Sequence, residues 1–112
     1  MKYPYVRGLL LEMYREAKAL HSDPVEAFHS IVSDPVKRNR YISARGKGGL
    51  VRSTWAEALE IVAAAHVHTI KYYGLDRCTG FTPIPAMSMV SFSAGVLFIQ
   101  LIGGVMTSFY DW

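Results

Sequence analysis

Apolar residues in the first part of the chain recur at intervals of three and four, which is the spacing of one face of a helix. The residues on this face are Val6, Leu9, Leu10, Met13, Ala17 and Leu20. This pattern predicts a helix that begins just after Pro4 and ends near His21, where the sequence changes to "HSDP".

The sequence "SDPV" then occurs twice, at residues 22–25 and 33–36. In each copy the Ser or the Asp can accept hydrogen bonds from the free N–H groups at a helix start. The Pro suits the first helical position because it has no N–H group. We therefore predict a short helix over residues 25–32, within a helical surface segment that spans residues 1–43.

A second long helical pattern begins at Thr54, which together with Glu57 forms a capping box. One broad face of this predicted helix carries Leu59, Val62, Ala63, His66, Val67 and Ile70. Gly74 is suited to the position just past its C-terminus. Ile61 lies on the opposite side, which indicates that the helix is covered on more than one face.

Shorter segments follow that helix. The sequence "DRCTGF" at residues 76–81 is typical of a buried strand, and "TPIP" at 82–85 is typical of a turn. Residues 86–102 are predicted to form a helix that ends at two glycines, and "VMTSFY" at 105–110 is again typical of a strand. The order helix, strand, helix, strand predicts an α/β unit with parallel strands.

Residues 78–110 contain no Asp, Glu, Lys or Arg, although the chain has 12 basic and 9 acidic residues. A bilayer needs about 20 consecutive apolar residues. The "TPIP" turn and the glycine pair divide this run, and its helical part contains three serines and Gln100. Because no Lys/Arg cluster flanks it either, we predict no transmembrane helix. The composition instead fits helices and strands that are covered on more than one side.

Two parallel strands do not make a complete sheet, and a helix this apolar needs cover over most of its surface. We therefore predict an α/β fragment: short N-terminal helices over residues 1–43, and then the start of an α/β domain over residues 44–112. Its parallel sheet is expected to be completed by residues outside the chain.

The charge is unevenly distributed, since residues 1–52 carry ten basic and five acidic residues, and residues 53–112 carry two and four. The basic residues form no block and are not interleaved with aromatic residues as in a stacking platform, so no nucleic-acid partner is predicted. The loop "SARGKGGL" at residues 43–50 is basic and rich in glycine. It fits a flexible connector or a cradle for an anion.

Cysteine and histidine give no clear chemical motif. The single cysteine, Cys78, cannot form an internal disulfide and is predicted to be a buried, inert thiol. The four histidines, His21, His29, His66 and His68, include no pair with the spacing of a metal site, and a core or surface role is expected for each.

Read as a whole, "RGKGGLVRSTWAEALEIVAAAHVHTIKYYGLDRCTGF" resembles the opening segment of the molybdopterin oxidoreductase superfamily. Within it, the chain most resembles the catalytic alpha subunits of membrane-bound respiratory nitrate reductases. The stretches that carry this resemblance are "REAKALHSDPVEAF", "ARGKGGLVRSTW", "TIKYYGLDR", "GFTPIPAMSMVSF" and "LIGG…SFYDW", and they extend nearly from end to end.

The resemblance implies an enzyme that reduces nitrate to nitrite at a molybdenum held by two pyranopterin guanine dinucleotides, in anaerobic respiration. It implies a 4Fe-4S cluster whose ligands precede the matched region. It also implies an iron–sulfur beta subunit, a membrane haem gamma subunit, and membrane association through these partners on the cytoplasmic face. Residues 44–112 would then begin the molybdopterin-binding domain. The 112 residues alone are expected to be inactive.

Two residues are candidate cofactor contacts. The resemblance places the aspartate that ligates molybdenum a few residues beyond Trp112. Asp111 is the alternative within the chain if that alignment is shifted by three or four positions. Thr82 lies in the predicted turn between a strand and a helix, where open α/β sheets bind ligands. It can donate a hydrogen bond to a pterin pyrophosphate there, or be part of a tight buried turn.

Two other classes of protein fit parts of the sequence. A small helical interaction protein would use the basic half on an acidic partner and the apolar half for oligomerisation. A small membrane-associated protein would use the uncharged run.

Overall fold

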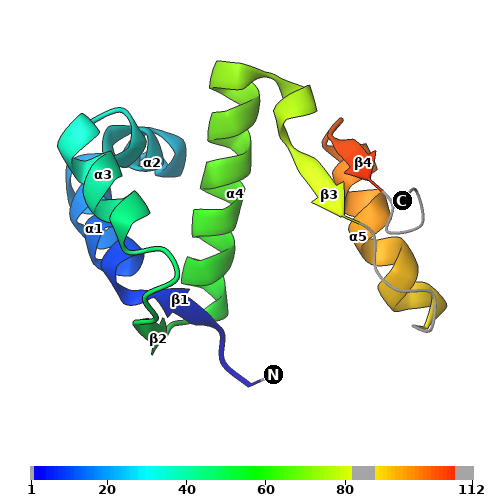
Figure 1. The fold of residues 1–112 in the computed structure, drawn as a ribbon, viewed down its shortest axis with the longest axis horizontal. Coiled ribbons are helices and arrows are strands. Elements are labelled where there is room, and N and C mark those ends of the chain that lie inside the picture. Colours follow the sequence, from blue (N-terminus) through cyan, green and yellow to red (C-terminus); the bar gives the residue numbers. More distant parts are fainter. Residues whose placement is uncertain (1, 82–87, 108–112) are drawn as a thin grey trace. The chain divides into compact units, whose positions relative to one another are not determined.

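The structure is a computed structural model that describes residues 2–81 and 88–107. Its elements form two compact units, residues 1–68 and residues 69–112, and the boundary between them falls inside the long helix α4, Trp55–Tyr73. Figure 1 shows the order of the elements along the chain, and each unit is described by itself below.

In the first unit, three helices follow one another: α1 (Gly8–Leu20), α2 (Pro24–Val32) and α3 (Pro35–Ser43). The predicted caps are confirmed. Asp23 accepts a hydrogen bond from the backbone N–H of Val25 at 2.7 Å, and Asp34 accepts one from the N–H of Val36 at 2.8 Å. The two copies of "SDPV" therefore begin two helices in the same way.

The predicted start of the first helix, just after Pro4, is wrong. Residues Tyr5–Arg7 form a strand, β1, and the helix begins at Gly8. Strand β1 pairs antiparallel with β2 (Leu50–Arg52), and Val6 lies opposite Val51. This pairing joins segments more than 40 residues apart, so the local spacing of apolar residues does not reveal it.

Buried side chains from α1, α2 and α4 form the core of the first unit. They are Leu11, Met13, Tyr14, Ala17, Ala27, Phe28, Ile31, Ile61 and Ala64. Tyr14 and Ile31 are almost fully enclosed. Burying apolar surface on this scale is the main source of stability for a small unit.

Helix α4 packs on the side that we interpreted as the minor one. Its buried residues are Ile61, Ala64 and His68, while Leu59, Val62 and Val67 of the broad apolar face are 59%, 50% and 48% exposed. The helix thus has two apolar sides, as Ile61 indicated, and the described residues cover one of them. Its predicted ends are correct, because it begins after Thr54 and Gly74 follows it with a φ of 108°.

The second unit contains a 3-10 turn (Leu75–Arg77), strand β3 (Thr79–Phe81), helix α5 (Met89–Leu101) and strand β4 (Val105–Thr107). The two strands are parallel, as predicted, with Thr79, Gly80 and Phe81 opposite Val105, Met106 and Thr107. The α/β class is therefore confirmed. The predicted "TPIP" turn lies wholly outside the residues that the structure describes, and so does the end of the second strand-like segment, residues 108–110.

Glycines let α5 approach the strands closely. A Cβ atom on Gly80 would lie 2.5 Å from Ile99 Cγ1, and one on Gly104 would lie 3.0 Å from Ile99 Cγ2. Ile99 and Cys78 are the buried apolar residues of this unit among those described. Most of α5 is exposed, including Met89 at 80% and Leu101 at 77%.

Among the described helices, none is both long and apolar enough to cross a membrane.

Candidate functional site

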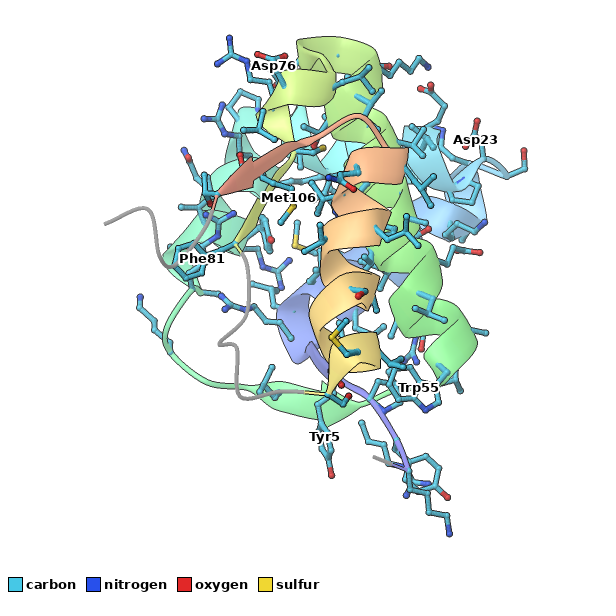
Figure 2. The ribbon with its side chains drawn as sticks, turned by 90° about the vertical axis from the view of Figure 1, so that its right-hand side faces the viewer. Tyr5, Asp23, Trp55, Asp76, Phe81 and Met106 are labelled. Carbon is cyan, nitrogen blue, oxygen red and sulfur yellow. The ribbon has the colours of Figure 1, made fainter. Side chains whose placement is uncertain are left out.

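The carboxyl end of the parallel strand pair is the first candidate site. Phe81 and Thr107 end β3 and β4 and lie opposite each other in register, so the chain leaves both strands at the same edge. The hydroxyl of Thr107 donates a hydrogen bond to the carbonyl oxygen of Gly80 at 3.1 Å, which joins the two strand ends. In Figure 2, Phe81 and Met106 mark these two strands. Ligands of open α/β sheets bind at such an edge.

The start of α5 belongs to the same part of the second unit, since α5 is the element that connects β3 to β4. Ser88 caps this helix by accepting a hydrogen bond from the backbone N–H of Ser91 at 3.3 Å. The first turn of α5 contains no acidic residue that would offset the positive end of the helix dipole. Such a helix start favours an anionic group nearby.

The two predicted contact residues, Thr82 and Asp111, lie outside the described residues. What the structure describes is the pair of strands that precede them: Thr82 directly follows β3, and Asp111 comes four residues after the end of β4. The role of each residue therefore stays a prediction.

Two histidines that are far apart in sequence meet in the first unit. His29 Nδ1 on α2 lies 3.1 Å from His68 Nε2 on α4, and the rings of Phe28 and His68 pack in a T-shaped arrangement with centroids 5.5 Å apart. His68 is only 4% exposed. Sequence spacing does not reveal this pair, because its members are 39 positions apart in the chain.

Among the residues that the structure describes, this histidine pair does not form part of a larger group of metal-ligating side chains. Structural zinc sites use four protein ligands, and catalytic ones use three. Within residues 2–81 and 88–107, no group of three or more His, Cys, Asp or Glu side chains converges. The pair is therefore best described as a polar contact that joins α2 to α4.

A network of charged side chains joins α1 to the start of α4. Arg15 donates two hydrogen bonds to the carboxylate of Glu57, at 2.6 and 3.0 Å, and Ser53 donates a third at 2.6 Å. In the predicted capping box, Thr54 accepts from the Glu57 N–H at 3.2 Å as expected. The Glu57 carboxylate contacts Ser53 and Arg15 instead of the Thr54 backbone, which the capping pattern does not anticipate.

Tyr14 extends this network into the core by donating a hydrogen bond to Glu60 at 2.8 Å, and Lys18 lies 3.6 Å from the same carboxylate. The residues around an open hollow of about 580 Å³ are Tyr14, Arg15, Lys18, Thr54, Ala56, Glu57 and Glu60. The charged groups among these lining residues pair with one another. The side chains that line this hollow therefore link α1 to α4, and they do not leave a charged group available to hold a ligand.

The network also shifts the pKa values of three of its side chains, Glu57, Arg15 and Tyr14. Hydrogen bonds from Arg15 and Ser53 lower the pKa of Glu57, and the same contact raises the pKa of Arg15. Burial, followed by the nearby Glu60 carboxylate, raises the pKa of Tyr14. Tyr14 is therefore a neutral hydrogen-bond donor at physiological pH, not an acid or base for catalysis.

The glycine-rich loop is a tight, exposed connection between α3 and β2. Gly46, Gly48 and Gly49 have φ values of 74–76°, which other residues rarely adopt. Two of its backbone N–H groups, those of Arg45 and Lys47, donate to carbonyl oxygens within the same turn. The loop therefore does not present these two groups to an anion, and the connector interpretation fits better.

Comparison with known proteins identifies the class to which these features belong. A family model described as molybdopterin oxidoreductase matches residues 1–112. The chain belongs to the molybdopterin oxidoreductase family.

Particular relatives are similar over the whole chain. All 112 residues align with the nitrate reductase alpha subunit of Mycobacterium tuberculosis (strain ATCC 25618 / H37Rv) at 69% identity, and with the respiratory nitrate reductase 1 alpha chain of Escherichia coli (strain K12) at 58%. They also align with the nitrate reductase-like protein NarX of M. tuberculosis at 67%. The chain spans 9% of the length of the two alpha subunits and 17% of NarX.

Proposed function

We propose that these 112 residues form part of the alpha subunit of a nitrate reductase, which reduces nitrate to nitrite during anaerobic respiration. The observation that carries this proposal is the 69% identity over the entire chain to a nitrate reductase alpha subunit. The aligned region includes the helical segment as well as the α/β segment, so the similarity is not confined to one cofactor-binding motif.

The cofactor that we propose is molybdenum bound by two molybdopterin guanine dinucleotides, and it would supply the two-electron transfer of an oxygen atom from nitrate. The described residues fit one feature of this group, its anionic pyrophosphate. The carboxyl edge of β3 and β4 belongs to the same β–α–β connection as the start of α5, whose first turn has no acidic residue. We propose that Thr82, directly after β3, contacts the cofactor at this edge.

The ligand to molybdenum is proposed to be an aspartate shortly beyond Trp112, with Asp111 as the alternative. Both follow β4, whose end lies opposite the end of β3, so either choice uses the same edge of the strand pair. In this proposal residues 1–43 form a helical surface segment. Residues 44–112 begin the molybdopterin-binding domain, whose sheet is completed by other parts of the subunit.

The proposal includes partners that the resemblance implies. An iron–sulfur beta subunit and a haem-containing gamma subunit would deliver electrons, through a 4Fe-4S cluster in the alpha subunit, and would associate the enzyme with the cytoplasmic face of the membrane. The 112 residues alone would be inactive, because most of the cofactor contacts would lie elsewhere in the subunit.

The test uses the full-length subunit that contains this segment, assembled with its cofactors. We expect it to reduce nitrate with a reduced viologen dye as electron donor. The Asp111→Asn variant should retain its molybdenum and most of its activity, whereas replacing the aspartate beyond Trp112 by asparagine should abolish both. Asp76→Asn, an exposed change in the same unit, serves as the control.

Two results would contradict parts of this proposal. Loss of molybdenum from the Asp111→Asn variant would assign the ligand to Asp111. A subunit that carries its full content of molybdenum and fails to reduce nitrate would exclude nitrate as the substrate.

A further inference from the structure

Arg7 has a buried charged nitrogen without a partner among the described residues. It is the last residue of β1 and directly precedes α1, and its side chain is partly buried. The Nη1 nitrogen is hidden from solvent, and no described residue accepts a hydrogen bond from it. Buried polar groups in folded proteins are almost always hydrogen-bonded, and an uncompensated buried charge is strongly unfavourable. This nitrogen therefore points to an interaction that the described residues do not supply.

The segments around Arg7 carry only positive charge. Strands β1 and β2 pair residues 5–7 with residues 50–52, and the segments 2–11 and 43–56 that contain these strands have five basic residues and no acidic one. The basic residues are Lys2, Arg7, Arg45, Lys47 and Arg52. We call them the basic cluster. The first turn of α1 has no acidic residue either.

The nearest acidic residues along the chain are engaged elsewhere. Glu12, the first carboxylate of α1, lies 4.0 Å from Arg40 on α3. Glu57, the first carboxylate of α4, is bound by Arg15 and Ser53. No described carboxylate therefore neutralises the basic cluster.

Aromatic contacts orient part of the cluster. The guanidinium of Arg52 lies over the ring of Tyr3, 3.0 Å from its centroid, and that of Arg45 lies over Tyr41 at 5.2 Å. A guanidinium stacked by its face keeps its N–H groups directed outward in its own plane. The N–H groups along the edge of a guanidinium can donate two parallel hydrogen bonds to an acceptor with two oxygens, such as a carboxylate.

We propose that the basic cluster, with Arg7 as its anchor, binds a carboxylate-bearing segment of the same subunit that lies outside residues 1–112. This rests on the proposed function, in which the chain is part of a much longer polypeptide, like the relatives of which it spans 9%. The charge of a guanidinium is delocalised over three nitrogens. Because the Arg7 side chain is only partly buried, a carboxylate that contacts its guanidinium also compensates the charge on the buried Nη1.

A carboxylate fits better than a phosphate group. Phosphate sites on glycine-rich loops use several converging backbone N–H groups. In the neighbouring loop, the N–H groups of Arg45 and Lys47 already donate to Ile42 and Ala44. The guanidiniums of Arg7, Arg45 and Arg52 supply planar edges with paired N–H groups, which match the two oxygens of an Asp or Glu side chain.

The first experiment identifies the partner in the full-length subunit. The Arg7→Lys variant keeps the charge and introduces a primary amine, which a zero-length carbodiimide reagent joins to a contacting carboxylate as an amide. We expect mass spectrometry to find the amine introduced at position 7 linked to an Asp or Glu outside residues 1–112. The matched control is Arg40→Lys, whose introduced amine should be linked to Glu12.

The second experiment tests whether removing the charge of Arg7 makes hydrogen exchange around it faster or slower. In the Arg7→Met variant of the full-length subunit, hydrogen exchange is measured for the amides of β1 and the first turn of α1. If a carboxylate pairs with Arg7, the substitution leaves that carboxylate unpaired, and exchange becomes faster by about tenfold or more. If no partner exists, the mutation removes an uncompensated charge, and exchange becomes slower or stays the same.

The proposal is overturned if the control variant is linked to Glu12 while Arg7→Lys is linked to no carboxylate, or only to one within residues 1–112. Slower or unchanged exchange in Arg7→Met would overturn it as well. Faster exchange without any link in Arg7→Lys would assign the site to a phosphate or a backbone carbonyl, and would also contradict it. Neither readout involves turnover, so nitrate reduction by the wild-type subunit tests the proposed function separately.

Discussion

The two compact units of this chain differ in how completely they bury their own apolar residues. In the first unit, nine buried side chains from three helices form one cluster, and both Tyr14 and Ile31 are almost fully enclosed. In the second unit, Cys78 and Ile99 are the buried apolar residues among those described, and α5 exposes apolar side chains along its length. The first unit is close to a small self-contained core, while the second has the secondary structure of an α/β layer without its cover.

This difference predicts the largest effect, which is one of local stability. In the isolated 112-residue chain, we expect the amides of α1 and α2 to exchange with solvent about 100-fold or more slowly than those of α5, because few contacts hold α5 in place. Hydrogen exchange with mass spectrometry measures both regions at once. In the full-length subunit the difference should largely disappear. Equal protection of α5 and α1 in the isolated chain would show that the second unit is stable by itself.

A smaller effect is expected from opening a cavity in the first core. Ile31 is 1% exposed on α2, so Ile31→Ala should lower the free energy of unfolding of this unit by about 2–5 kcal/mol. The matched control is Ile42→Ala on α3, where the side chain is 40% exposed and the cost should stay below about 1 kcal/mol. Urea titration followed by helical circular dichroism gives both values. Similar costs at the two positions would mean that the Ile31 cluster is not the core of the unit.

The smallest effect concerns the charged network between α1 and α4. Arg15 lowers the pKa of Glu57, so the contribution of this pair to stability is fully present above about pH 4.3, where an unshifted glutamate titrates. It is lost as the pH falls through the lower pKa of the folded state. Glu57→Gln should therefore be less stable than the wild type at pH 7, and the difference should vanish in strong acid.

The effect of Glu57→Gln stays small because the Arg15 side chain is 62% exposed, and water screens the pair. Thermal unfolding of both proteins from strong acid to neutral pH follows it. Glu16→Gln, an exposed change on α1, is the control, and a constant difference between Glu57→Gln and wild type at every pH would exclude the ionic contribution.

Features that depend on neighbouring residues could be predicted from the sequence. The "SDPV" caps, the start of α4 at Thr54 and its end at Gly74 are all correct, because a cap needs only three or four consecutive residues. The parallel pairing of β3 and β4 followed from the order of elements, since a strand–helix–strand connection of this length favours parallel strands.

Features that depend on distant residues were not predicted. The pairing of β1 with β2 changed the start of the first helix, and the contact of His29 with His68 joins residues 39 positions apart. Periodicity showed that α4 has two apolar sides, but not which one packs within the first unit, because both sides carry similar residues. The proposed roles of Thr82 and Asp111 depend on family resemblance and stay predictions.

The register of β3 and β4 has a consequence for how such a subunit would be assembled. Because Phe81 lies opposite Thr107, a ligand at that edge would touch two stretches of chain that are separated by a whole helix. Ligand binding there would hold together the two ends of the segment that connects β3 to β4 through α5. Each contact with the ligand would add to the stability of the second unit, which buries little apolar surface of its own. Ligand binding at this edge and the final ordering of this layer would then be one thermodynamic event, and among the described helices α5 should be the most vulnerable to proteolysis while the edge is empty.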